Sequence, residues 1–355
     1  FRVTEKPTGS VNFGTSVGAG VGGLAGFVGY EQPNLFGKGK AGSLRWDFGR
    51  YQNNQIMSYT DPGVFGSLVS GSANLFNTRD RFISFRSGRR RRAGFDIRFG
   101  FLLPGARFTR IFTGYGLSQT ELTLRSGEDI SLFGRPAGTQ STMSVGITRT
   151  TLNHPIFPTV GSRQSVNMEF TGGPLGGDGK FLKTTTEGTW WLPVGTAGGS
   201  PDNPGSGVTF ALGMTMRSGV LNGDSEAFPF DRFWMGGVQF GQRLRGYDET
   251  TVTPLGYFQD RSREIRDIER MGEAFFSFST EFAMRVGTQV SGSIFMDAGN
   301  VWRNAREIDP TRMYRGAGIG IQLVTPFGPV GLDYAYGFDK VEPGWQFHFR
   351  LGPGF

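Results

Sequence analysis

Apolar and polar residues alternate with a period of two in segments along the whole chain, and this pattern constrains the fold most strongly. Successive side chains of a β-strand point to opposite faces, so an extended segment of this kind has one apolar and one polar face. About sixteen such segments, each of roughly 9–13 residues, predict an all-β protein. Clear examples are GFDIRFGFL, VTFALGMTM, VGLDYAYGF and GWQFHFRL.

The polar faces decide between two kinds of β-protein. A soluble sandwich also alternates, but here the polar face carries Asp, Arg, Glu, Gly and Ser through aromatic-rich segments. A polar interior inside an apolar, aromatic exterior is typical of a membrane barrel, whose tilted strands have this length. The 58 glycines and 14% aromatic residues suit such a barrel and argue against disorder. We therefore expect a transmembrane antiparallel β-barrel of about 16 strands.

The connections between segments alternate in length. Turns rich in Pro and Gly are short, and they include NLFGKG, DPG, LPGAR and TPFGP. The longer polar loops are expected at 78–92, 119–140, 219–271 and 299–311. Short turns at one end and long loops at the other match the periplasmic and extracellular ends of an outer-membrane barrel. The stretch PVGTAGGSPDNPGSG departs from this pattern, because it is long at the end expected to be short.

The composition argues against several classes of protein. No window approaches 18 consecutive apolar residues, so transmembrane helices are not expected. The chain has no cysteine and only two histidines, which argues against disulfides, zinc sites and a His-based catalytic triad. No acid pair beside a nucleophile and no phosphate-binding loop is apparent. We therefore expect no enzymatic activity, no cofactor and no metal.

The beginning of the chain differs in character from the rest. It reads FRVTEKPTGS and lacks the pattern of a signal peptide. We expect residues 1–8 to be the tail of an upstream module and residues 9–355 to form the barrel.

The longest expected loop, 219–271, carries a tetrad formed by Leu244, Arg245, Gly246 and Tyr247. A barrel of about sixteen strands has a lumen wide enough for a channel, so this loop can fold inward and plug it. The alternation places Glu281 and Asp297 on the inner faces of neighbouring strands. A guanidinium binds carboxylates bidentately in a poorly hydrated site. We therefore expect Arg245 to contact Glu281 or Asp297; the alternatives are a solvated arginine and ordinary lumen acids of a porin.

Several segments resemble one known family. FDRFWMGGVQFGQRLRGYDE resembles the sixth extracellular loop of the BamA family, the barrel subunits of the outer-membrane β-barrel assembly machinery. Its V/I/L-R-G-F/Y motif is matched by the tetrad Leu244–Tyr247. FSTEFAM and SIFMDAGNVW resemble the family strands whose acids hold the arginine, and the first two and the last segments are also similar. The likeness spans essentially the whole chain, and the family carries POTRA domains ahead of its barrel.

The resemblance implies a function in the outer membrane of a Gram-negative bacterium. It implies an insertase that needs no cofactor and folds unfolded outer-membrane β-barrel clients into the membrane. Its implied partners are these clients, periplasmic lipoprotein subunits, and outer-membrane lipids including lipopolysaccharide. The alternatives are a sister translocase, TamA-like or of the two-partner secretion type, and a passive porin.

Two sequence features predict a weak seam between the first and last strands. The first strand, around Val11 to Ala19, is glycine-rich and has few side chains to pack. The last strand ends in LGPGF, whose proline cannot donate a ladder hydrogen bond. The alternatives are glycines that relieve crowding and a frayed terminus. The seam residues expected in the first strand are Val11, Phe13, Gly14, Thr15, Val17 and Gly18, and the terminal strand signal comprises Trp345, Phe347, Phe349, Leu351 and Phe355.

The stretch RSGRRRRAG holds five arginines, Arg86 and Arg89 to Arg92, in an expected outer loop. No aromatic residues are interleaved for base stacking, so a nucleic-acid partner is not expected. Two interpretations remain open, contact with anionic lipid headgroups and a solvated loop.

Overall fold

The computed structural model describes residues 9–18, 23–49, 52–81, 89–123, 137–198, 207–225, 228–238, 241–259, 265, 267–287, 289–325 and 328–351. Sixteen strands form one sheet in chain order, from β1 to β11 and then from β14 to β18. Every strand pair whose register is described is antiparallel, as in the pairing of β14 with β15. The predicted fold class, an all-β transmembrane barrel of sixteen antiparallel strands, is confirmed.

The strands of the sheet have the following bounds: β1 Ser10–Gly18, β2 Gly23–Leu35, β3 Lys40–Gly49, β4 Gln52–Asp61, β5 Ser70–Arg81, β6 Arg89–Leu102, β7 Thr109–Thr123, β8 Ala137–Thr150, β9 Gly161–Gly172, β10 Lys180–Ala197, β11 Val208–Asp224, β14 Ala274–Val286, β15 Val290–Trp302, β16 Tyr314–Thr325, β17 Gly328–Gly337 and β18 Gly344–Leu351. Two short strands, β12 Val252–Thr253 and β13 Gly256–Tyr257, pair with each other in the long loop. In the part of the chain that the structure describes, no helix is long and apolar enough to cross a membrane.

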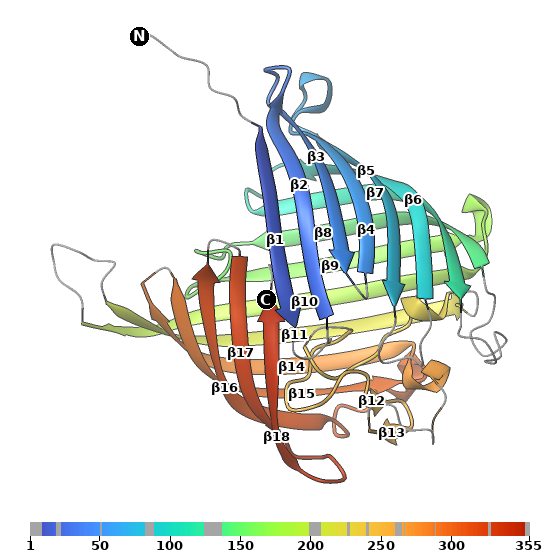
Figure 1. Ribbon diagram of the computed structural model, residues 1–355. Helices are drawn as coiled ribbons and strands as arrows, with labels where there is room; N and C mark the ends of the chain where they lie inside the picture. The colour runs from blue at the N-terminus through green and yellow to red at the C-terminus, as the bar shows by residue number, and fades with distance from the viewer. Residues whose placement is uncertain are drawn as a thin grey trace. The chain divides into compact units, whose positions relative to one another are not determined.

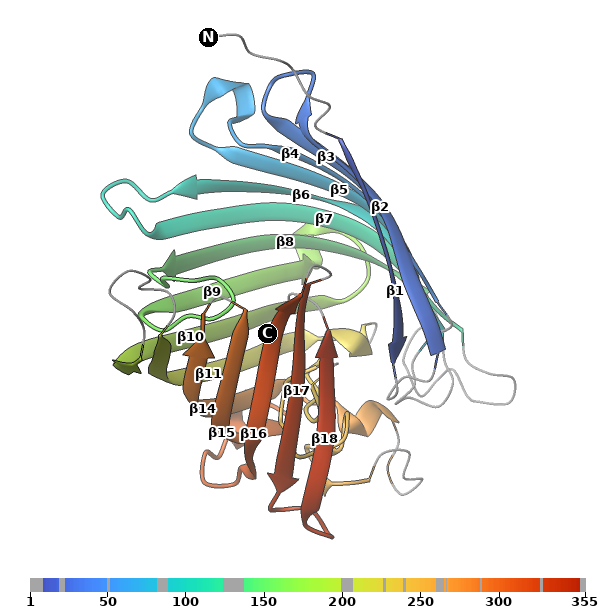
Figure 2. The same cartoon turned by 60° about the vertical axis from the view of Figure 1, so that its left-hand side comes forward.

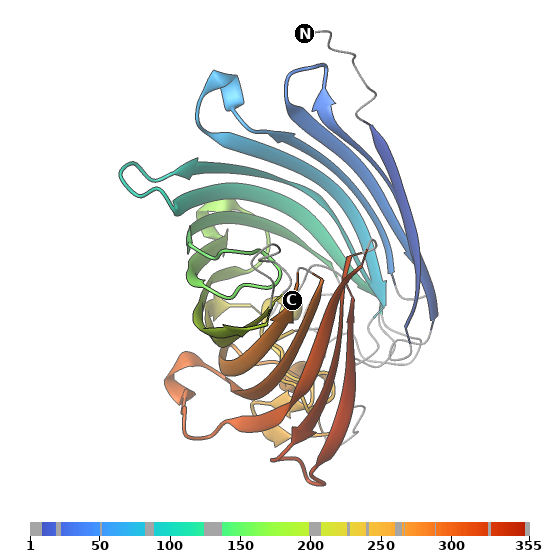
Figure 3. The same cartoon turned by 90° about the vertical axis from the view of Figure 1, so that its left-hand side faces the viewer.

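The chain divides into two compact units. Unit 1 comprises Phe1–Gly146 and Glu169–Lys180, and unit 2 comprises Ile147–Met168 and Phe181–Phe355. In unit 1, strands β1 to β7 lie side by side in a curved sheet (Figure 3). In unit 2, strands β14 to β18 form a curved wall, and the loop that carries β12 and β13 lies against one face of it (Figures 1 and 2). The tetrad and its expected partners therefore all belong to unit 2.

The predicted alternation is visible in the burial of side chains in unit 2. On β15, Ile294 is 65% exposed and Met296 is 50% exposed, whereas Asp297 between β14 and β16 is buried. On β18, Trp345 and Phe347 are exposed and His348 is buried. Because the exposed face is apolar and the buried face is polar, the pattern is that of a barrel wall with lipid on its outside.

Several strands are longer than the sequence pattern predicts. Strand β10 has 18 residues and β11 has 17, whereas a tilted strand needs only about 9–11 residues to span a bilayer. The additional residues shorten the expected loops. Strand β10 runs to Ala197 and so takes up the beginning of the anomalous stretch PVGTAGGSPDNPGSG.

The expectation that Arg89 to Arg92 lie in a loop is wrong, because they form the start of β6. Two of them have cross-strand partners: Arg90 is paired with Asp80 on β5, and Arg92 donates to Ser118 on β7. The charge run indicated a loop, but these partners stabilise an extended strand.

Some expectations fall on parts that the structure does not describe. Residues 1–8, Ala19, Arg86 and Phe355 lie outside the described residues. The side chains of Gly14 to Gly18 and of Leu351 do so as well, although their backbone is described in β1 and β18. In the first strand, Val11 and Phe13 have exposed side chains.

Candidate functional site

The loop between β11 and β14 folds back on itself just before the tetrad. Gly236 and Gly237 have φ of 125° and 67°, a left-handed region that favours glycine. The N–H of Gly237 donates to the carbonyl of Tyr247, and the N–H of Leu244 donates to the carbonyl of Gly237. The two glycines in front of the tetrad therefore form the turn that presents it.

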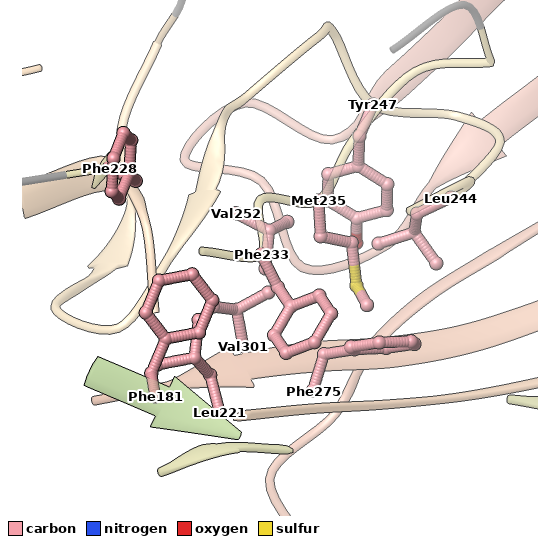
Figure 4. Close-up of a cluster of buried hydrophobic side chains, with 10 residues drawn as sticks. All are labelled: Phe181, Leu221, Phe228, Phe233, Met235, Leu244, Tyr247, Val252, Phe275 and Val301. Carbon is pink, nitrogen blue, oxygen red and sulfur yellow. The ribbon is translucent and has the colours of Figure 1, made fainter. Parts of the chain in front are cut away.

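An apolar cluster fixes this loop on the wall. Loop side chains pack against strand residues, and the rings of Phe233 and Phe275 lie 4.7 Å apart between their centroids. Because burial of apolar side chains stabilises by about 1.5–3 kcal/mol each, the cluster gives the loop a core of its own. Its members are Phe181, Leu221, Phe228, Phe233, Met235, Leu244, Tyr247, Val252, Phe275 and Val301 (Figure 4).

Arg245 forms a bidentate ion pair with Asp297 of β15. Its Nε lies 2.7 Å from Oδ2 of Asp297, and its Nη2 lies 2.7 Å from Oδ1. The backbone N–H of Arg245 also donates to Oδ2, at 3.2 Å. The Arg245 side chain has no exposed surface. Two parallel charge-assisted bonds in a buried site fix both the position and the orientation of the guanidinium.

Further groups surround the guanidinium of Arg245. The hydroxyl of Ser279 on β14 donates to Oδ1 of Asp297 at 2.6 Å and accepts from Nη2 of Arg245 at 3.2 Å. The ring of Phe295 lies 3.3 Å from the guanidinium carbon, which is a cation–π arrangement. Nη1 of Arg245 lies 3.8 Å from Oδ1 of Asp333 on β17. Side chains from β14, β15 and β17 thus enclose one loop residue.

Glu281, the other expected partner of Arg245, makes no hydrogen bond or ion pair with it among the described residues. The register explains the difference: Ser279 is opposite Asp297, and Glu281 is opposite Phe295. Glu281 therefore lies two residues farther along β14, about 7 Å at strand spacing. Its charge still attracts Arg245 through space.

Glycines on the wall let the backbone of the tetrad approach closely. A β-carbon added to Gly316 on β16 would lie 2.1 Å from the carbonyl oxygen of Arg245. One added to Gly337 on β17 would lie 2.4 Å from the carbonyl oxygen of Gly246. Gly246 itself has φ of 91° and packs against the backbone of Tyr336. Only glycine fits these contacts, so the tetrad lies directly on the backbone of β16 and β17.

The tetrad is also joined to the last strand. The N–H of Gly246 donates to Nε2 of His348 on β18 at 2.9 Å. The side-chain amide of Gln346, also on β18, donates to the carboxylate of Asp248. Arg350 of β18 pairs with Asp333, with 2.8 Å between Nε and Oδ2. Asp333 therefore lies between an arginine of the loop and an arginine of the last strand.

Tyr247 fixes the other end of the tetrad. Its hydroxyl donates to the carbonyl of Arg315 at 2.8 Å and accepts from the N–H of Asp339 at 3.1 Å. Its ring meets those of Tyr257 and Tyr314 edge-on. Burial raises the pKa of Tyr247, so its phenol remains protonated as a donor.

Electrostatics keep Arg245 charged despite its burial. Burial alone lowers the pKa of a guanidinium, but Asp297 raises the pKa of Arg245 above its ordinary value. The arrangement is an ion pair whose two partners are held in a fixed orientation. The described residues also include no group of three or more His, Asp or Glu side chains placed to hold a metal ion.

Residues 34–355 match the Omp85 superfamily domain. The chain belongs to the Omp85 superfamily. It is 26% identical to the outer membrane protein assembly factor BamA of Nitratidesulfovibrio vulgaris, over all of this chain and 43% of that protein. It is also 26% identical to BamA of Neisseria meningitidis serogroup B, over all of this chain and 48% of that protein. The chain thus spans less than half the length of these relatives.

Two solved structures share the Omp85 fold of this chain. The structure of BamA from Haemophilus ducreyi lacking POTRA domains 1–3 has a TM-score of 0.76 at 23% identity, and covers 97% of this chain and 70% of that one. CdiB from Acinetobacter baumannii has a TM-score of 0.60 at 13% identity, and covers 96% and 58%. The fold and the curated relatives locate this Omp85 chain in the Gram-negative outer membrane.

Sequence reasoning missed several residues of the Omp85 chain's site. Phe295, Asp333 and His348 all alternate with apolar residues of the outer face, so their inward direction was readable from the sequence. Their proximity to Arg245 was not readable, because it depends on the register across β15 to β18.

Proposed function

We propose that this chain is the membrane-embedded barrel of an outer-membrane protein assembly factor, which pairs the edge of its first strand with incoming client strands. The curated relatives support an assembly role, since they are named assembly factors. The site is compatible with a role without catalysis, because Arg245 and Arg350 are each paired with a carboxylate.

The observation that carries the proposal is the position of β1 and β18, which are the first and last members of the strand order. Glycines along β1 leave few side chains to pack, and the proline after β18 cannot donate a ladder hydrogen bond. We therefore infer a weak seam. An exposed strand edge then binds an added strand through its backbone.

The loop contributes to this function by holding the last strands of the sheet in place. Its tetrad contacts β14 to β18 through buried charges and close backbone packing. The loop thus holds the last strand, which leaves β1, whose Val11 and Phe13 are exposed, as the edge for pairing. Client selection is tolerant, because backbone bonds supply the affinity and outward aromatic residues set the register.

Two further elements complete the proposal. A hydrophobic belt that is shorter near the seam thins the bilayer and lowers the barrier to insertion. The partners are unfolded β-barrel clients and the periplasmic lipoprotein subunits of an assembly complex. The relatives support the clients of this proposal, since they are named outer membrane protein assembly factors.

Cysteine crosslinking in the full-length protein tests the proposal. The chain has no cysteine of its own, so single cysteines can be placed at successive positions from Asn12 to Ser16. We expect them to crosslink to the terminal strand of a client during assembly. Cysteines at Val166 and Met168 on the interior strand β9 are the matched control and should give none.

Two experimental results would contradict the proposal. Normal client assembly with the seam locked by an engineered disulfide would exclude edge pairing. Crosslinks from the lumen to an extended, secreted polypeptide instead would favour a sister translocase.

A further inference from the structure

The arginine run at the start of β6 is divided between the two faces of the sheet. Arg90 and Arg92 lie on the polar face and have partners there. Nη2 of Arg90 lies 3.1 Å from Oδ2 of Asp80, and Nε of Arg92 donates to the hydroxyl of Ser118 at 3.1 Å. These two arginines therefore have their partners within the sheet.

Arg89 and Arg91 lie on the opposite face, which they share with Phe95 and Ile97. This is the apolar face that contacts lipid in a membrane barrel. The register places Arg79 of β5 directly opposite Arg91. All three arginines are exposed. We call Arg79, Arg89 and Arg91 the rim patch.

The rim patch has one acid for three arginines. Oε2 of Glu121 on β7 lies 4.0 Å from Nη1 of Arg91, and both side chains are half exposed. Among the described residues, no other acid pairs with the patch. Like charges placed directly opposite each other on one face of a sheet are destabilising. The pairing of Arg79 with Arg91 therefore has a cost that a bound anion removes.

The position of the patch indicates which anion it meets. On the same face, Leu75 is 56% exposed and lies four residues before Arg79, about 14 Å along the strand. Asn77 lies between them and accepts from Nε of Arg91. The sequence alternation of loops assigns this end of β5 and β6 to the extracellular side. The patch thus follows the apolar belt at the level of the headgroups of the outer leaflet.

We propose that the rim patch binds the phosphate groups of phosphorylated glycolipid in the outer leaflet. Guanidinium groups bind phosphate bidentately, and a phosphate between Arg79 and Arg91 converts their repulsion into two attractions. This binding depends on the chain's place in the membrane and not on the assembly activity. It gives the barrel a lipid contact on the wall of unit 1.

Native mass spectrometry of the purified chain in detergent, titrated with lipid A, tests this proposal. The test variant is R79Q/R89Q/R91Q, and the matched control is R90Q/R92Q/R98Q, which removes three arginines from the polar face of the same sheet region. Each cation near an anionic surface strengthens binding roughly fivefold, so the test variant should bind roughly a hundredfold more weakly. Dephosphorylated lipid A should bind wild type and test variant equally.

A single substitution is expected to strengthen binding, which a variant that has merely lost its fold cannot do. Glu121→Gln removes the one acid of the patch and should strengthen lipid A binding several-fold. Equal losses in the test and control triple variants would show that only total charge matters and would overturn the proposal. Unchanged binding in both triple variants, or weaker binding in E121Q, would overturn it as well.

Discussion

The backbone N–H of Gly246 donates to Nε2 of His348 across 2.9 Å, and this bond joins the loop tetrad to the last strand. Nε2 accepts only when the imidazole is neutral and carries its proton on Nδ1. Gly246 is buried, so its N–H has no water to replace this acceptor. His348 therefore couples the position of the loop to the position of β18, as does the bond from Gln346 to Asp248.

Replacing His348 by Leu should destabilise the protein by about 1–3 kcal/mol, because the Gly246 N–H is left buried without an acceptor. The measurement is urea unfolding of the chain in detergent. His348→Gln retains an acceptor and is the matched control, with a smaller expected loss. Equal losses in the two variants would show that packing, and not the hydrogen bond, is what His348 contributes.

Removing either Arg245 or Asp297 should be costly, and removing both should cost less than the sum. Arg245→Met leaves the carboxylate of Asp297 buried without its cation. Asp297→Asn leaves the buried guanidinium with only the longer contact to Asp333, at 3.8 Å. Each should lose about 3–5 kcal/mol in unfolding free energy. A double-mutant cycle measures the coupling. If the losses of the two single variants add up to that of the double variant, Arg245 and Asp297 do not interact directly.

Glu281→Gln serves as the contrast to the Asp297 variant. Glu281 acts on Arg245 only through space, so its replacement should cost clearly less than Asp297→Asn. Comparable losses at the two acids would mean that the register described for β14 and β15 does not decide which acid holds the arginine.

Gly316→Ala should displace the loop from the wall. The added β-carbon would lie 2.1 Å from the Arg245 carbonyl oxygen, and such overpacking costs about 1–3 kcal/mol. Faster protease cleavage within 241–259 measures the displacement. Gly292→Ala on β15, whose β-carbon would come no nearer than 3.7 Å to another atom, is the control and should leave the rate unchanged.

Stability should depend on pH through Asp339, which lies in the turn after β17. Burial raises the pKa of its carboxyl, but hydrogen bonds from Arg315 outweigh this and hold the pKa below its ordinary value. A lowered folded-state pKa contributes stability above the unfolded-state value, about 3.9, which is lost as the pH falls through the folded-state value. Wild type should therefore unfold at a higher temperature than Asp339→Asn at pH 7, and the two should converge in acid. If the difference in unfolding temperature between wild type and Asp339→Asn stays constant down to pH 2, the ion pair of Asp339 with Arg315 does not stabilise the fold.

The sequence was sufficient for the strand pattern and for placing Glu281 and Asp297 on the inner face, because alternation alone decides which residues face inward. It was not sufficient to choose Asp297 over Glu281. That choice depends on whether Ser279 or Glu281 stands opposite Asp297, and register is set by pairing along the whole strand. The contacts of Asp333 and His348 were missed for the same reason.

The arginines Arg89 to Arg92 show a different limit of prediction from sequence. Four consecutive charges indicate a solvated loop, yet Arg89 to Arg92 lie on a strand. Each polar-face arginine there has a cross-strand partner from a segment at least 10 residues away in the sequence. Such partners are decided by tertiary pairing and cannot be read from local composition.

Proline scanning of β1 tests the exposed edge that the proposed function requires. Successive N–H groups of a strand point to opposite sides, so one of Thr15 and Ser16 donates toward β2 and the other toward the free edge. Proline removes the N–H. Only the proline on the free-edge side should reduce client assembly while it leaves the barrel's resistance to urea unchanged. The other should lower that resistance.

Thr15→Val and Ser16→Ala keep the N–H and control for the loss of each hydroxyl. Assembly is measured as the fraction of a client that becomes resistant to protease in membranes containing the full-length protein. A passive porin would show no effect on clients from either proline. If both prolines reduce assembly only in proportion to the stability that they remove, the first strand does not act as a template and edge pairing is excluded.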